Sequence, residues 1–517
     1  MMGSAVNMTL SLAEMGVVVT SQKGAHYSAL LLLLLISIAK FRALTKPKTT
    51  APIFDPPGFF EFSATRRKKQ ALHGGQSLLK RSEKAYPGTC FRIMADFGEV
   101  TMLPLKYVNE VRNDERFDLG GWSLHSFPEN VRGLDAFRSR KGQIAEVSKR
   151  YLTKYLNTYT QPLNEETALA LSETLTEDQD WHAISLKHVV LHLTTRISSR
   201  VFLGKELCRN EAWLKVSREY AVAAFLAVRQ AVIWPPPLRG LISRFLPWSR
   251  RAVSLIQDAR RCMAPVLERR QHERASENYI PYNDAIEWLE ASNIPGKDDP
   301  VLAQLALSAL AIHTTADLLS QAVGDLAVHH DFFEPLRDEI TECLVQEGWE
   351  SKSLYNMKLL DSCIKESQRM KPLAMISMGR RVETDVTLSD GTFLPKGSLT
   401  AFSCQQRWDH TLYSNPFQWD GARFFKKRQE KGQERTAQLV ATSPDNMAFG
   451  YGRQACPGRF FAASVTKIVL AHLLLKYDVR LHDREPQTTA LGFALSSDAT
   501  VKVDVRRRRE GVDLASM

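Results

Sequence analysis

A single cysteine, Cys456, stands in the stretch FGYGRQACPGRFF, with Pro457 directly after it and glycines at Gly452 and Gly458. Pro457 has a preset φ that suits the first turn of a helix, and the apolar spacing that follows predicts a long buried helix. A thiol at a helix start meets unpaired N–H groups and the positive end of the helix dipole, which favour the thiolate. The two glycines leave room for a large flat ligand. These residues predict a ligand site, and the alternative is a buried core cysteine.

Two further stretches have residue types suited to a role in a site. Glu366 and Arg369, in LLDSCIKESQRMKPL, are three residues apart, so their side chains share one helix face and can pair. Arg423, in FQWDGARFF, supplies a second guanidinium for the same carboxylate. In ALAIHTTADLL, Thr314 and Thr315 lie in an apolar helix, where a hydroxyl can bond a carbonyl one turn back and loosen the helix.

Together these features resemble the cytochrome P450 superfamily of heme-thiolate monooxygenases, from about Pro52 to the C-terminus. FGYGRQACPG matches the family's F-x-x-G-x-x-x-C-x-G loop, and ESQR matches its E-x-x-R helix. The order along the chain also agrees, with the threonine helix first, then E-x-x-R, the arginine and the cysteine. The resemblance implies the cytochrome P450 fold, and the sequence pattern itself predicts a mainly α protein with small β-sheets (α+β).

The resemblance implies heme b as the cofactor, with the Cys456 thiolate as the axial ligand of its iron. Phe449, Gly452 and Gly458 would lie in the loop around that ligand, with Phe449 beneath the porphyrin. Thiolate ligation favours cleavage of the O–O bond. The family's structural triad, which fixes the fold around this loop, would comprise Glu366, Arg369 and Arg423.

The distal side departs from the family's usual pattern, in which an acidic residue precedes the catalytic threonine. Here His313 precedes Thr314, and Ala311 stands where glycine is common. We expect Thr314 to hydrogen-bond dioxygen or its water, and His313, with an ordinary pKa of about 6.5, to help relay protons. The alternative is that His313 only packs or bonds a neighbouring helix.

A second departure is Gln454, where the family usually has a basic residue that pairs with a heme propionate. Another cation must supply that charge. Arg380, in MISMGRRVETDV, is the predicted replacement, with its neighbour Arg381 and the more distant Lys149 as other candidates. Each of the three could instead be an ordinary surface cation.

Composition narrows the remaining possibilities for this chain of 517 residues with a net charge of +11. Its seven cysteines include no C-x-x-C pair, so neither a disulfide framework nor a zinc site is indicated. The positive charge comes without a nucleic-acid-binding motif, so no nucleic-acid partner is expected. The arginine run at 506–509 is predicted to be a solvated tail.

The apolar run at 25–41 predicts a transmembrane anchor, of a length that suits a thin bilayer. Cations crowd its C-terminal side, which by the positive-inside rule places 1–24 in the lumen and the bulk of the chain in the cytosol. We therefore expect a single-pass protein of the endoplasmic reticulum membrane, with a cleaved signal peptide as the alternative. Prolines mark 42–60 as a linker, and 61–517 is the expected catalytic domain.

Within that domain, GTCFRIMA and EVTMLPL predict a β-hairpin, and 142–344 is overwhelmingly helical in pattern. The helical pattern breaks at IWPPPLRGLISRFLPW, where Trp234, Phe245 and Trp248 alternate with arginines. Such a mixture suits a membrane interface, although it also suits a plain surface loop. A second β segment is expected between Asp385 and Ser403.

The heme loop and the His-Thr-Thr triplet look most like fungal members of the superfamily that oxidise terpenoid and indole-diterpenoid skeletons. This implies an NADPH- and O2-dependent monooxygenase acting on a hydrophobic polycyclic substrate, such as a terpenoid, meroterpenoid or indole-diterpenoid intermediate. Electrons would come from NADPH-cytochrome P450 reductase, whose acidic face could meet a basic surface here. The alternatives are a heme-thiolate isomerase or dehydratase that needs no external electrons, and a noncatalytic heme-binding membrane protein.

Overall fold

The computed structural model describes residues 27, 49–59, 61, 63–138, 143–292 and 299–509. The chain divides into two compact units, the smaller being Met1–Thr50 with Thr387–Pro395 and the larger Ala51–Val386 with Lys396–Met517. All candidate site residues lie in the larger unit. The predicted luminal segment and anchor, apart from Tyr27, lie outside the described residues, as does the start of the predicted linker.

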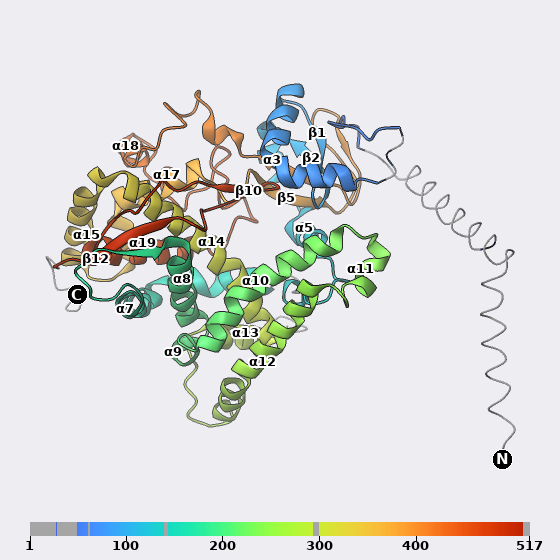
Figure 1. Ribbon diagram of the computed structural model, residues 1–517. Helices are drawn as coiled ribbons and strands as arrows, with labels where there is room; N and C mark the ends of the chain where they lie inside the picture. Colours follow the sequence, from blue (N-terminus) through green and yellow to red (C-terminus); the bar gives the residue numbers. More distant parts are fainter. Residues whose placement is uncertain are drawn as a thin grey trace, which may run out of the picture. The chain divides into compact units, whose positions relative to one another are not determined.

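The larger unit is mainly helical with small sheets, as the sequence predicted (Figure 1). Its longer helices are α3 (Thr65–Ala85), α7 (Leu156–Leu175), α8 (Leu186–Phe202), α10 (Glu211–Val232), α12 (Pro247–Arg274), α14 (Pro300–Val328), α15 (Phe333–Glu347), α17 (Lys358–Met370) and α19 (Arg459–Lys476). Its shorter helices are α4 (Val108–Val111), α5 (Leu119–Ser126), α6 (Gln143–Val147), α9 (Gly204–Leu207), α11 (Pro236–Ile242), α13 (Ala285–Ala291), α16 (Ser351–Asn356) and α18 (Arg423–Gln429).

The largest sheet has the strand order β1-β2-β8-β5-β3. Its strands are β1 (Phe91–Ala95), β2 (Gly98–Leu103), β3 (Phe117–Asp118), β5 (Ile376–Val382) and β8 (Leu399–Ser403). The predicted hairpin is confirmed, because β1 and β2 pair antiparallel with Ala95 opposite Gly98. The expected β segment after Asp385 is also present as β6 (Val386–Thr387), β7 (Phe393–Leu394) and β8.

A second sheet, of order β4-β12-β9, joins segments that are distant in the sequence. Strand β4 (His182–Ser185) interrupts the stretch predicted to be helical and pairs with β12 (Lys502–Arg507), which also pairs with β9 (Tyr477–Leu481). The expectation that the terminal arginine run is a solvated tail is therefore wrong. Val503 and Val505 bury their side chains on one face of β12, and the Nε of Arg506 lies 3.0 Å from Asp478 Oδ2. A third, short pair is formed by β10 (Thr489–Leu491) and β11 (Ala494–Ser496).

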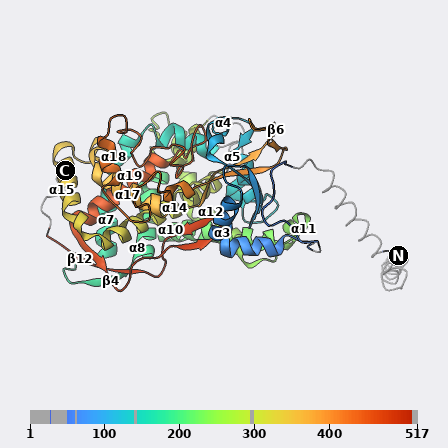
Figure 2. The ribbon, with the colours of Figure 1, turned by 90° about the horizontal axis from the view of Figure 1, so that it is seen from above.

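Helix α14 runs through the core of the larger unit. Figures 1 and 2 both place it among α8, α10 and α17, and it packs against all three. Among the described helices it alone is long and apolar enough to cross a membrane, yet 72% of that stretch is buried within the fold. It begins with Pro300 after Asp299, whose side chain accepts a hydrogen bond from Val301 N. Helix α14 is therefore a core helix, and any open surface in its middle requires an explanation.

Candidate active site

The loop from Phe449 to Gly458 is held by its own backbone. The N–H of Cys456 donates to the carbonyl oxygen of Phe449 at 2.7 Å, and Phe449 packs partly buried against the main core. Gly452 has a φ of +81°, and a Cβ there would lie 2.5 Å from the carbonyl oxygen of Arg112. Gly452 is thus required by the turn and by close backbone packing against Arg112. At Gly458 a Cβ would make only an ordinary contact, 4.0 Å from Cys456 Sγ.

Cys456 is exposed, whereas the other six cysteines are buried or partly buried. Surrounding protein nevertheless desolvates the thiol and raises its pKa, while the N–H groups of Gly458 and Arg459 act in the opposite direction. Our expectation that the helix start lowers the pKa of the free thiol is therefore wrong, because desolvation outweighs the N–H groups. The sulfur is therefore accessible from one side and surrounded by protein on the others. The alternative of a buried core cysteine does not hold.

Side chains from both directions fix this loop to its neighbours. The amide of Gln454 accepts a hydrogen bond from Leu119 N at 2.9 Å and donates one to Phe117 O at 3.1 Å. On the other side, the hydroxyl of Thr153 donates to Pro457 O at 3.2 Å. Gln454 therefore clamps the loop to the junction of β3 and α5. The sequence identifies Gln454 only as a position that lacks the family's usual cation. A side-chain amide, however, can donate one hydrogen bond and accept another at the same time.

The structure brings Glu366, Arg369 and Arg423 together. Glu366 is fully buried, and its two oxygens accept from Nε and Nη2 of Arg369, each at 2.8 Å, and from Nε of Arg423 at 3.0 Å. Nη1 of Arg369 donates to the carbonyls of Arg407 and Pro416, and Nη1 of Arg423 donates to Ser414 O. The triad thus ties α17 to the segment 407–423.

Helix α17 also holds the chain on both sides of the cysteine loop, through residues that the sequence analysis missed. Nζ of Lys365 donates to Thr436 O and Gln438 O, and burial lowers the pKa of this lysine to about 7. Asp361 accepts from Leu439 N at 2.8 Å and pairs at 2.7 Å with Lys467 of α19, the helix after the cysteine. The available signal was the i, i+4 spacing of Asp361 and Lys365 on a face that also carries the E-x-x-R motif.

On α14, Leu310 is 55% exposed and Thr314 is exposed, although most of this helix is buried. The two residues are one turn apart and share a face, so this face is open in the middle of a helix that is otherwise mostly buried. The hydroxyl of Thr314 donates to Leu310 O at 2.9 Å, in the manner that the sequence suggested, while Thr315 is buried. The helix remains continuous through this point.

His313, the second predicted distal residue, lies between this open face and α10. Its Nε2 is 2.9 Å from the carbonyl oxygen of Arg218, on α10. Burial is the main cause that lowers the pKa of the ring below its ordinary value, while the bond to Arg218 O acts in the opposite direction. His313 therefore bonds a neighbouring helix, in the way that the alternative from the sequence described.

The three candidate cations differ sharply in their surroundings. Arg380, on β5, is 2% exposed, and burial lowers the pKa of its guanidinium to about 10. Its buried Nη2 has no hydrogen-bond partner within the part of the chain that is described. Arg381 is half-exposed with Glu383 at 3.9 Å, and Lys149 is exposed.

These features fit the heme that the resemblance implies. The exposed thiol of Cys456 offers a soft ligand for iron, and the neighbouring backbone N–H groups can temper a sulfur charge. The unsatisfied N–H of Arg380 is a donor of the kind that a carboxylate substituent would satisfy. The residues present therefore suit a porphyrin that carries both iron and carboxylates.

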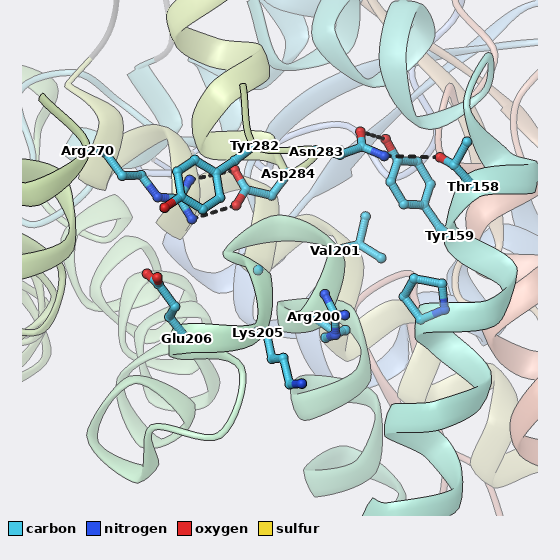
Figure 3. Close-up of a pocket in the computed structure, with 12 residues that line it drawn as sticks. Thr158, Tyr159, Arg200, Val201, Lys205, Glu206, Arg270, Tyr282, Asn283 and Asp284 are labelled. Atoms are coloured by element: carbon cyan, nitrogen blue, oxygen red, sulfur yellow. Dashed lines mark hydrogen bonds and ion pairs between the residues drawn. The ribbon is translucent and has the colours of Figure 1, made fainter. Parts of the chain in front are cut away.

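A separate surface cavity of about 520 Å³ lies between α7, α9, α12 and the start of α13 (Figure 3). Its buried charges are already paired, since both terminal nitrogens of Arg270 bond the carboxylate of Asp284, at 2.9 and 2.7 Å. Tyr159 donates to Asn283 Oδ1 at 2.7 Å on the opposite side. None of the predicted site residues lines this cavity, so we interpret it as a structural feature of the place where these helices meet.

Comparisons with known proteins agree with this site. The family model described as Cytochrome P450 matches residues 76–500. The cytochrome P450 monooxygenase TRI1 of Fusarium sporotrichioides is 40% identical over 469 residues, covering 90% of this chain and 86% of the relative. The cytochrome P450 monooxygenase hepE of Aspergillus oryzae is 40% identical over 499 residues, covering 93% and 90%. The solved structure of retinoic acid bound cyanobacterial CYP120A1 has a TM-score of 0.64 at 17% identity, over 89% of this chain and 99% of that one, which shows the same fold.

Proposed function

The chain belongs to the cytochrome P450 family as a heme-dependent monooxygenase, and from this premise we propose that it oxidises a hydrophobic polycyclic substrate of fungal secondary metabolism. A terpenoid, meroterpenoid or indole-diterpenoid intermediate is the substrate class that we propose. The observation that carries this proposal is the exposed apolar side chain of Leu310, which is 55% exposed on α14 although most of that helix is buried. Val222 and Phe225, on the neighbouring helix α10, are 45% and 51% exposed.

Aromatic side chains adjoin the exposed residues Val222 and Phe225 of α10, and together we call them the apolar wall. The ring of Phe225 meets that of Phe127 edge to face, with centroids 5.3 Å apart, and Phe127 stacks on Phe137 at 4.3 Å. Rigid rings and branched side chains recognise a rigid hydrocarbon skeleton by shape, with few polar contacts. A large hydrophobic polycycle is the ligand that such a surface suits.

In the proposed mechanism Cys456 would hold the iron, and the buried guanidinium of Arg380 would pair with a heme propionate. When bound, the heme supplies the activation of dioxygen. Thr314 presents a hydroxyl on the open face of α14, where it orients a water or dioxygen by hydrogen bonding and passes on a proton. Leu310 excludes bulk water beside it. Glu366, Arg369 and Arg423 would hold the segment 407–423 against α17 and touch no substrate.

The test is to express the full chain with a reductase and supply extracts from a host that lacks the protein. We expect NADPH-dependent products that carry one oxygen atom from isotopically labelled dioxygen. Products that form without NADPH and carry no label would instead indicate the isomerase or dehydratase. Heme binding without any product from polycyclic terpenoids would refute the proposed substrate class.

We propose NADPH-cytochrome P450 reductase as the electron donor, docking on the cysteine-loop side. Thr153 hydrogen-bonds to Pro457 in the cysteine loop. The segment around Thr153 carries three exposed cations, Lys149, Arg150 and Lys154. Exposed cations of this kind steer an acidic partner and act mainly on the association rate. Reversing the charge of Arg150 and Lys154 should raise the reductase concentration needed for half-maximal NADPH-driven reduction, and the difference should shrink at high salt. An unchanged requirement would place the docking surface elsewhere.

We further propose that the protein resides in the endoplasmic reticulum membrane, with residues 25–41 as a single-pass anchor and the catalytic domain in the cytosol. An exposed apolar surface around α11 supports membrane contact by the larger unit. Its members are Ile233, Trp234, Leu238, Leu241, Phe245 and Trp248. A glycosylation site added before residue 24 should be modified in microsomes, and an unmodified N-terminus would refute this orientation.

A further inference from the structure

The hydrogen bond between His313 and α10 fixes which ring nitrogen carries the proton. Nε2 lies 2.9 Å from the carbonyl oxygen of Arg218, and a carbonyl oxygen can only accept. Nε2 is therefore the donor, and in the neutral ring Nδ1 carries a lone pair. A proton relay through this ring would need either the charged imidazolium or a tautomer that breaks the bond to α10.

The groups around His313 oppose the charged form of the ring. Besides burial, the cations Lys187 on α8 and Arg218 on α10 lower its pKa, while Asp317 on α14 and the bond to the Arg218 carbonyl raise it. Asp317 is already engaged by Lys187 at 3.4 Å and by the backbone N–H of Ser497 at 2.7 Å. The neutral ring with its proton on Nε2 is therefore the resident form.

Arg218 extends the contact to a third helix. Its Nη1 lies 2.9 Å from Nδ1 of His192, on α8, and since a guanidinium only donates, this nitrogen of His192 accepts. The backbone of Arg218 thus bonds α14 while its side chain bonds α8. Helix α10, which carries the exposed side chains Val222 and Phe225, is thus hydrogen-bonded through Arg218 to both α14 and α8.

We propose that His313 is a positioning residue that ties α10 to α14 and so sets the spacing between the apolar wall and the Thr314 hydroxyl. The role of the wall in holding substrate rests on the proposed function, whereas the tie between the helices does not. Loss of the tie would let α10 move away from α14, so that a bound substrate would sit less firmly beside Thr314. The expected defect is poor coupling of NADPH use to product, with heme binding intact.

Three substitutions of His313 separate this role from a proton relay. His313→Gln keeps an N–H at the reach of Nε2 but cannot titrate, whereas His313→Phe keeps the ring volume and loses the donor. His313→Asn, whose amide is too short to reach the carbonyl, gives a second loss of the tie should the Phe variant fold poorly. Hydrogen exchange of the α10 amides in the holoprotein should quicken about fivefold in the Phe and Asn variants, as expected when one hydrogen bond is lost, and stay unchanged in the Gln variant.

The second measurement is product formed per NADPH consumed between pH 6 and 8, with reductase and the extract that supplies the substrate. We expect the Gln variant to keep the wild-type ratio and pH profile, and the Phe and Asn variants to lose much of the ratio at every pH. Hydrogen exchange of the α10 amides at the wild-type rate in the Phe and Asn variants would overturn the proposal that His313 ties α10 to α14. A Gln variant with normal exchange but poor coupling would show that a titrating ring is needed, which overturns the positioning role. The exchange measurement decides on the tie even if no terpenoid is oxidised.

Discussion

Replacing Glu366 with glutamine perturbs a fully buried charge that joins α17 to the segment 407–423. Both oxygens of Glu366 accept only N–H donors, from Arg369, Arg423 and the backbone of Asp420. The amide NH2 of a glutamine would face one of these donors, and two guanidiniums would lose their carboxylate. Removing one partner of a buried ion pair costs about 3–5 kcal/mol, so we expect the free energy of unfolding to fall by that amount.

Glu334 provides a matched control, because it pairs with Arg337 three residues later on α15 but has a side chain that is 71% exposed. An exposed pair of this kind contributes about 0.2–1 kcal/mol. Urea unfolding of the holoprotein, with the ferrous carbonyl absorption band as the measure of retained heme, compares Glu366→Gln with Glu334→Gln. We expect heme loss only in the first variant. Unfolding of Glu366→Gln within about 1 kcal/mol of the wild type, with heme retained, would refute the reasoning.

Three further substitutions probe separate parts of the molecule. Burial lowers the pKa of His472 to about 3. In the unfolded state the ring has a pKa of about 6.5, so the unfolded chain binds the proton first as the pH falls. The free energy of unfolding, measured in urea, should therefore fall by about 2 kcal/mol between pH 6.5 and 5, and His472→Gln should remove this pH dependence. Arg380→Gln should speed heme transfer to an apoglobin, whereas Arg381→Gln should not; equal rates would exclude Arg380 as the propionate partner. Thr314→Ala should lower product per NADPH, while Thr315→Ala, at a buried position, should leave the ratio nearer the wild type; unchanged coupling in Thr314→Ala would rule this threonine out.

The parts of the site that the sequence predicted depend on local spacing. Glu366 and Arg369 are one helical turn apart, so their pairing follows from helix geometry once α17 forms. The same holds for the helix after Cys456 and for the hydroxyl of Thr314, which bonds the carbonyl of Leu310 one turn back. The hairpin of β1 and β2 also needed only alternating residues around a two-residue turn.

The parts that the sequence did not predict depend on segments that meet only in the folded chain. Strand β4 pairs with β12 more than 300 residues later, and its four residues give no periodic signal of their own. The pKa of Cys456 depends on how much protein surrounds the sulfur, which no helix-start argument contains. Gly452 is required by the carbonyl of Arg112, a distant neighbour that the motif does not name.

The buried cations of α17 are explained by the backbone carbonyls to which they donate hydrogen bonds. The chain from 404 to 458 is buried in part yet contains little regular structure, so many of its carbonyls need donors from elsewhere. Lys365 donates to the carbonyls of residues 436 and 438, and Arg369 donates to the carbonyls of residues 407 and 416. The carboxylates of Asp361 and Glu366 lie beside these cations and offset part of the cost of burying them. An apolar helix could fill the same volume, but it would leave these carbonyls unsatisfied and the loop that presents Cys456 without a fixed position.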